Sequence, residues 1–93
     1  MNNKLDLTTI ILTYNEELHV RRCLENVCSI SKKVYVIDSP STDRTVEICK
    51  EFPEVEVVVH DYPGNQASQY NWAIDNLPID TEWTLRIDAD EYL

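Results

Sequence analysis

The sequence predicts an α/β fold, in which a parallel sheet of about four strands is covered by helices on both faces. Four short runs of apolar and β-branched residues lie along the 93-residue chain, separated by segments with apolar residues at helical spacing. The connections are short, which is typical of right-handed β-α-β units. With 43% hydrophobic residues the chain can bury a modest core, so we expect one domain over residues 1–93.

The expected strands cover residues 7–14, 34–38, 55–59 and 82–87. The first, LTTIILTY, is apolar or β-branched almost throughout, which is typical of a strand buried on both faces of a parallel sheet. Turn or capping residues follow each run. We therefore interpret all of them as strands of one sheet.

Three helices are expected between the strands. Asn15 is expected to cap the first, with Glu16 and Glu17 in its first turn, where the helix dipole favours acidic side chains. The second is expected over residues 45–52, and the third ends before Pro78. The predicted apolar faces consist of Val20, Cys23, Leu24 and Val27 in the first helix, Val46, Cys49 and Phe52 in the second, and Ala67, Tyr70, Ile74 and Leu77 in the third.

The composition argues against several classes of partner and site. The formal net charge of −9 disfavours nucleic acid and anionic membrane surfaces, because both are polyanions. There is no run of about 18 apolar residues to form a transmembrane helix, and the first residues lack the layout of a secretory signal. Gly64 is the only glycine, which excludes a P-loop, a G-x-G-x-x-G loop and a G-x-S-x-G elbow.

The three cysteines are an odd number, and the spacing of Cys23 and Cys28 fits neither a disulfide framework nor a zinc site. We expect free, mostly buried thiols. Free thiols favour a reducing, cytoplasmic location.

Polar clusters directly follow three of the expected strands. They are Thr13-Tyr14-Asn15-Glu16 after the first, Asp38-Ser39 after the second and Asp88-Ala89-Asp90 after the fourth. In open α/β sheets ligands bind outside the carboxyl ends of the strands, so we expect a binding site there. Asp88 and Asp90 would point to the same side of a strand, and paired carboxylates suit Mg²⁺ or Mn²⁺ shared with substrate phosphates.

These clusters resemble motifs of the nucleotide-sugar-binding half of family 2 glycosyltransferases, which have the GT-A fold. The similar motifs are Thr13-Tyr14-Asn15-Glu16, Asp38-Ser39-x-Ser41-Thr42-Asp43-x-Thr45 and Asp88-Ala89-Asp90-Glu91. The Gln69-x-Asn71-Trp72-Ala73 and Trp83-x-Leu85-x-Ile87 segments resemble the subgroup that adds sugars to bacterial lipopolysaccharide core. The resemblance extends over residues 7–93.

The resemblance implies a pocket for the nucleotide base near the first strand. Thr13 and Tyr14 would line the base, with Tyr14 available for stacking. Asn15 and Glu16 would border the same pocket. All four are thus expected to be substrate-binding residues.

The resemblance also implies contacts to the rest of the donor. Asp38, with Ser39 beside it, would accept a hydrogen bond from the base or ribose. Asp88 would reach the ribose or the metal, and Asp90 would bind the Mn²⁺ or Mg²⁺ ion that clamps the diphosphate. The metal ligands are therefore expected to be Asp88 and Asp90.

The implied partners are a nucleoside-diphosphate sugar, with a UDP-sugar favoured, and a glycan or lipid-linked acceptor. The implied location is cytoplasmic, including the inner face of the membrane. Family members are much longer, and their second half supplies the acceptor site and the general base. We therefore expect a truncated donor-binding domain that is inactive alone, with its catalytic residue unknown, and we interpret Glu91 as a supporting or surface residue.

Two positions depart from the family pattern. Pro40 stands where glycine is usual, which restricts the loop after Asp38, and Tyr70 stands where the subgroup often has arginine. A sheet in the order 3-2-1-4 would leave the fourth strand on an edge. An apolar edge invites pairing with another chain, so we expect self-association.

Some interpretations stay open at this point. Trp72 and Trp83 are interpreted as core residues rather than a platform for sugar, whereas Gln69 and Asn71 fit either the pocket or a solvated helix face. A non-catalytic nucleotide-binding or interaction module is an alternative function. A nucleotidyltransferase is another, although its usual basic, glycine-rich loop is missing after the first strand.

Overall fold

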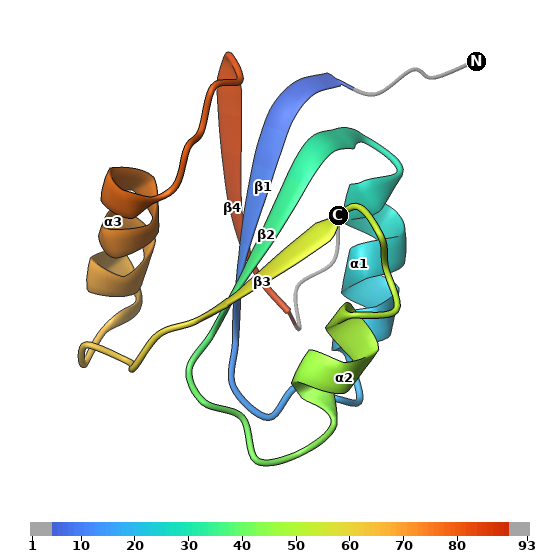
Figure 1. Cartoon of the computed structure of the whole chain (residues 1–93), viewed down its shortest axis with the longest axis vertical. Helices are drawn as coiled ribbons and strands as arrows, with labels where there is room; N and C mark the ends of the chain where they lie inside the picture. Colours follow the sequence, from blue (N-terminus) through green and yellow to red (C-terminus); the bar gives the residue numbers. More distant parts are fainter. Residues whose placement is uncertain (1–4, 90–93) are drawn as a thin grey trace.

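The computed structural model describes residues 5–89 and confirms the predicted fold class. Its elements are β1 (Leu5–Thr13), α1 (Val20–Cys28), β2 (Ser31–Asp38), α2 (Thr45–Cys49), β3 (Val55–Val59), α3 (Gln66–Asn76) and β4 (Trp83–Asp88). The strands are all parallel, in the predicted order β3-β2-β1-β4. Helices α1 and α2 cover one face of the sheet, and α3 covers the other (Figure 1).

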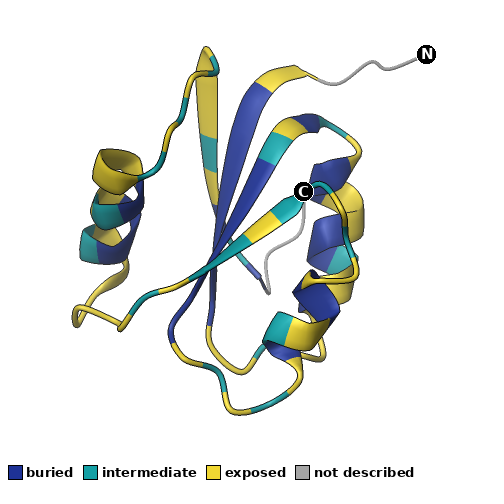
Figure 2. Ribbon diagram, viewed as in Figure 1, coloured by how far each residue is buried: buried dark blue, intermediate teal, exposed yellow. Residues whose placement is uncertain are grey.

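Strand β1 lies in the middle of the sheet between β2 and β4, and residues 7–13 are buried along its length (Figure 2). The strand register pairs Thr13 with Asp38 of β2 and Leu12 with Asp88 of β4. Since parallel strands end at the same edge of a sheet, Thr13, Asp38 and Asp88 from the three polar clusters come together there, as the sequence predicts.

Side chains of β1 alternate between two separate cores. Ile11 belongs to the core under α1 and α2, together with Leu24 and Val36. Ile10 belongs to the core under α3, together with Tyr35. A sheet buried on both faces explains why its central strands are continuously apolar.

The first helix begins later than the sequence predicts. Asn15 does not cap it: its φ angle is 52°, in the left-handed region that asparagine tolerates better than most residues. The carbonyl of Glu16 accepts hydrogen bonds from the N–H groups of His19 and Val20, which forms a separate turn. Helix α1 then starts at Val20, with its predicted apolar face buried.

Several predictions of buried residues are wrong. In α3 the buried residues are Gln69, Tyr70 and Ala73, whereas Ala67 is exposed and Ile74 is 45% exposed. Trp83 is 66% exposed and is no core residue, because it starts β4, the edge strand, in which Ile87 is the only buried residue. Helix α2 is also shorter than expected, since it ends at Cys49.

Helix α3, with 11 residues, is far shorter than a bilayer is thick. Across residues 5–89 no helix combines the length and apolar character that a membrane span requires.

Candidate functional site

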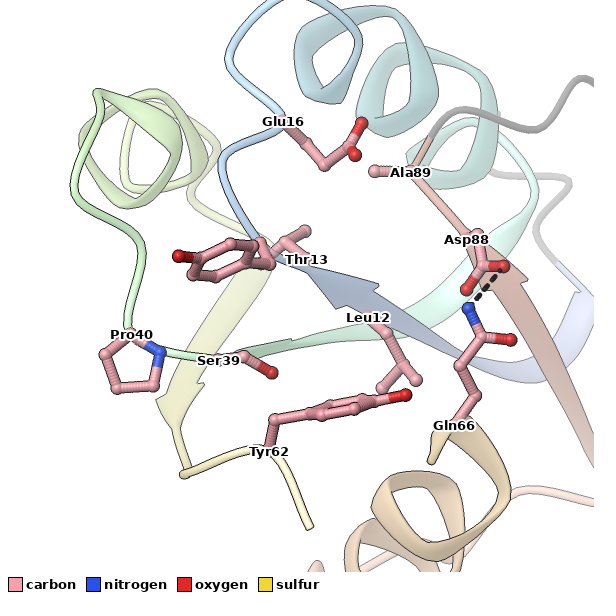
Figure 3. Close-up of a pocket in the computed structure, with 10 residues that line it drawn as sticks. Leu12, Thr13, Glu16, Ser39, Pro40, Tyr62, Gln66, Asp88 and Ala89 are labelled. Atoms are coloured by element: carbon pink, nitrogen blue, oxygen red, sulfur yellow. Dashed lines mark hydrogen bonds between the residues drawn. The ribbon is translucent and has the colours of Figure 1, made fainter. Parts of the chain in front are cut away.

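A pocket of about 550 Å³ opens at the carboxyl ends of β1, β2 and β4 (Figure 3). Its lining residues are Leu12, Thr13, Tyr14, Glu16, Ser39, Pro40, Tyr62, Gln66, Asp88 and Ala89. Most residues predicted from the sequence to bind substrate are therefore in it. Asn15 and Asp38 are not among the lining residues, and Asp90 lies outside the part of the chain that the structure describes.

Asp38 is almost completely buried and joins the end of β1 to the loop after β2. The hydroxyl of Thr13 donates to its Oδ1 at 2.7 Å, and the backbone N–H of Ser41 donates to its Oδ2 at 2.8 Å. The Ser41 hydroxyl also donates to Oδ1. Both carboxylate oxygens thus have protein partners, which makes Asp38 a structural anchor beside the pocket.

Asn15 joins the loop after β1 to the loop after β2. Its backbone N–H donates to Ser41 Oγ at 2.9 Å, and its side-chain Oδ1 accepts from the Thr42 N–H at 2.8 Å. The left-handed backbone at Asn15 allows both bonds to form to one short segment. Its role is to shape the rim of the pocket.

Asp43 and Thr45 continue this connection between the loops. Thr45 Oγ1 accepts from the Glu16 N–H at 2.8 Å, and Asp43 Oδ2 accepts from the Glu17 N–H at 3.3 Å. The Thr45 N–H donates to Asp43 Oδ1 at 2.9 Å. Burial alone would raise the pKa of Asp43, but the hydrogen bonds from Thr45 and Glu17 outweigh it and hold that pKa below its ordinary value of 3.8.

Asp88, at the end of β4, receives two side-chain hydrogen bonds from α3. Gln66 Nε2 donates to its Oδ2 at 3.0 Å, as Figure 3 shows, and the Tyr70 hydroxyl donates to its Oδ1 at 3.4 Å. The guanidinium of Arg86 lies 5.5 Å from the centre of the Tyr70 ring. Tyr70 thus contacts the first aspartate of the acidic motif through its hydroxyl.

The charge of the pocket lining is negative. Glu16 and Asp88 are acidic, and no lysine, arginine or histidine is among the lining residues within the described range 5–89. Mg²⁺ and Mn²⁺ prefer oxygen ligands, so the carboxylates of Glu16 and Asp88 are suitable ligands for such an ion. Within residues 5–89 no three histidine, cysteine or acidic side chains gather into a metal-binding cluster.

Sequence reasoning missed Tyr62 and Gln66. Tyr62 lies in the loop after β3, and its ring extends beside Leu12 in the pocket (Figure 3). Gln66 begins α3. The only signal for Tyr62 was a bulky aromatic residue within a loop of turn residues. Gln66 lies seven residues beyond the end of β3, so its distance from the strand end gave no signal.

The cysteines are free and buried, as predicted. Burial, the charge of Asp38 and the neighbouring Cys23 raise the pKa of the Cys49 thiol to about 12. A thiol of this kind is a poor nucleophile at neutral pH. The cysteines therefore serve the core and not the chemistry of the site.

Curated relatives of the chain are glycosyltransferases. The SPbeta prophage-derived glycosyltransferase SunS of Bacillus subtilis is 36% identical over 91 residues, which cover 94% of this chain and 21% of the relative. Uncharacterized glycosyltransferases of Rickettsia typhi and Rickettsia conorii are each 37% identical, over 94% and 100% of this chain and 28% and 32% of their own lengths. The chain thus spans between a fifth and a third of the length of these relatives.

The family comparison covers nearly the whole chain. Residues 8–93 match the model of glycosyl transferase family 2. The parallel sheet in the order β3-β2-β1-β4, with helices on both faces, is consistent with half of a GT-A domain. The chain therefore belongs to glycosyl transferase family 2.

Proposed function

We propose that the pocket binds the nucleoside diphosphate of a sugar donor, with a UDP-sugar favoured, and that Mg²⁺ or Mn²⁺ joins the diphosphate to Asp88 and Asp90. The observation that carries the proposal is the charge of the lining, whose described residues include Glu16 and Asp88 and no basic side chain. A diphosphate would be repelled by such a lining unless a cation accompanied it. When bound, the ion would stabilise negative charge on the departing nucleoside diphosphate.

Two tyrosines support a role in holding the base. Tyr14 is 60% exposed and Tyr62 is 50% exposed, and both line the pocket. Stacking of a base on an aromatic side chain contributes about 1–3 kcal/mol. Thr13 and Ser39 add hydroxyl groups to the same lining.

For these 93 residues the proposal is donor binding within a glycosyl transfer reaction. Transfer also requires an acceptor site and a general base, and we assign neither to the described residues. The resemblance to lipopolysaccharide core enzymes favours a glycan or lipid-linked acceptor, at the cytoplasmic face of a membrane.

Calorimetric titration with UDP, with and without Mn²⁺, tests the proposal. We expect binding that depends on Mn²⁺ and falls at least tenfold in Asp88→Asn, since this change removes one carboxylate ligand. Asp75→Asn is the matched control, because Asp75 is an exposed acidic residue of α3 that does not line the pocket. Equal UDP affinity with and without Mn²⁺, or an Asp88→Asn affinity equal to that of the control, would contradict it.

A further inference from the structure

Gln69 of α3 is completely buried and connects the ends of two strands. Its Nε2 donates to the backbone carbonyl of His60, after β3, at 3.0 Å, and to Ser39 Oγ, after β2, at 3.4 Å. Its Oε1 lies 2.7 Å from Nδ1 of the His60 ring. The sequence left open whether this residue is solvated, and its 0% exposure decides that it is not.

The carbonyl of His60 fixes the orientation of the Gln69 amide. A carbonyl oxygen can only accept a hydrogen bond, so the NH₂ group of Gln69 must face it. The oxygen of Gln69 then faces His60 Nδ1, which must carry a hydrogen to donate. Trp72 stacks on the same imidazole, with ring centres 3.7 Å apart and planes inclined by 19°, and so holds its plane.

The same orientation determines how the Ser39 hydroxyl is used. The second hydrogen of Gln69 Nε2 points to Ser39 Oγ, which therefore accepts. A serine hydroxyl that accepts from the protein still has its own hydrogen to donate. Ser39 is 7% exposed and lines the pocket, and its oxygen is directed into the pocket in Figure 3.

The backbone of Ser39 is also held in place. Its N–H donates to the carbonyl of Thr13 at 2.9 Å, which continues the pairing of β1 with β2 beyond the strand end. With its backbone N–H and one of the two lone pairs of its hydroxyl engaged, Ser39 keeps its hydroxyl hydrogen available for a ligand in the pocket.

We infer that Gln69 is a positioning residue that makes Ser39 a hydrogen-bond donor to an acceptor oxygen of the bound nucleotide. The acceptor belongs to the base, the ribose or a phosphate, all of which present such oxygens. The inference rests on the proposed function for the identity of the ligand. The orientation of Gln69 is a property of the ligand-free protein and can be tested separately.

The ligand-free test is nitrogen NMR of the histidine rings of the 93-residue chain, at a pH high enough to deprotonate them. The chain has two histidines, and the exposed His19 serves as the internal reference. We expect His60 to hold its hydrogen on Nδ1, and Gln69→Met to return it to the tautomer ratio of His19. A hydrogen on Nε2 of His60 in the unmodified chain would overturn the inference.

The ligand test is a double-mutant cycle on UDP affinity in the presence of Mn²⁺. Ser39→Ala and Gln69→Met should each weaken binding about fivefold, the usual effect of one hydrogen bond. Their combination should be no weaker than Ser39→Ala alone, because Gln69 acts through Ser39. Multiplied losses in the double variant would overturn the inference, and Ser29→Ala, in an exposed serine after α1, is the control.

Gln69→Glu keeps the inference testable if Gln69→Met does not fold. One carboxylate oxygen still accepts from His60 Nδ1, so the tautomer should stay unchanged. The other oxygen loses the hydrogen bond to the His60 carbonyl and can only accept a hydrogen bond from Ser39. UDP affinity should then fall to that of Ser39→Ala, and unchanged affinity would overturn the inference. Failure of the unmodified chain to bind UDP contradicts the proposed function instead, while the His60 tautomer still decides the orientation of Gln69.

Discussion

The hydroxyl of Thr13 donates a 2.7 Å hydrogen bond to the buried carboxylate of Asp38, across the ends of β1 and β2. The two residues face each other in the strand register. Family resemblance implies that Asp38 contacts the nucleotide, whereas the geometry gives each of its oxygens a partner in the protein. These two roles make different predictions.

Asp38→Asn should destabilise the fold by about 1–3 kcal/mol. The NH₂ group of the asparagine would face the Thr13 hydroxyl or the Ser41 N–H, each of which donates to Asp38. Urea unfolding measures this change, and Asp61→Asn, in the exposed loop after β3, is the matched control. A loss of UDP affinity in Asp38→Asn with an unchanged free energy of unfolding would show instead that Asp38 binds the ligand directly.

Asn15 should tolerate glycine better than alanine. Both substitutions remove the hydrogen bond to Thr42, but only alanine is strained at a φ of 52°. We expect Asn15→Ala to lower the free energy of unfolding by about 1 kcal/mol more than Asn15→Gly. Equal values in urea unfolding of the two variants would contradict the backbone argument.

Asp43 should contribute to acid sensitivity. Its pKa in the folded chain lies below the ordinary value of 3.8, so its ionised form is favoured by folding. The resulting stability is present at neutral pH, above the unfolded-state pKa, and is lost as the pH falls through the folded-state pKa. Unfolding measured at pH 7 and pH 3 should therefore show a smaller loss on acidification in Asp43→Asn than in the unmodified chain, and an identical loss would argue against these bonds.

The thiols should react only when the chain unfolds. All three cysteines are buried, and the pKa of Cys49 is raised to about 12. With a chromogenic disulfide reagent at pH 8, we expect little reaction of the thiols in buffer and complete reaction in concentrated urea. Rapid reaction of any thiol in buffer would show that the core around α1 and α2 opens readily.

The edge of β4 should promote self-association of the 93-residue chain. Among the strands of residues 5–89, β4 pairs with β1 alone, and Trp83 is 66% exposed. Sedimentation at increasing concentration should reveal dimers or larger species, and Trp83→Lys should reduce them. A monomer at every concentration would refute this prediction.

The alternation of strands and helices was predictable because it depends on local patterns. Continuous apolar runs such as residues 34–37 are buried on both faces, as expected of a parallel sheet. The three polar clusters were also recognisable, since each directly follows a strand. The strand register places Thr13 opposite Asp38 and Leu12 opposite Asp88, in agreement with this interpretation.

The remaining features depend on partners that are distant in the sequence. Gln69 can be buried because its amide donates a hydrogen bond to the backbone carbonyl of His60. A pattern of apolar residues in the sequence does not show such a bond. The exposure of Trp83 follows from its place at the start of an edge strand. Asparagine is a common residue at helix N-caps, and only the hydrogen bonds from Asn15 to Ser41 and Thr42 reveal its other role.

The bonds between the loops after β1 and β2 have a consequence for ligand selection. Because Asn15, Asp38 and Asp43 bind neighbouring backbone groups before any ligand arrives, that side of the rim is preorganised, and a ligand need not order it. The loop that carries Tyr62 is exposed from residue 61 to 65, and residues 61–64 make no backbone hydrogen bond to another loop of the described chain. If the pocket binds the proposed donor, we expect substitutions in this loop to change ligand preference without destabilising the fold.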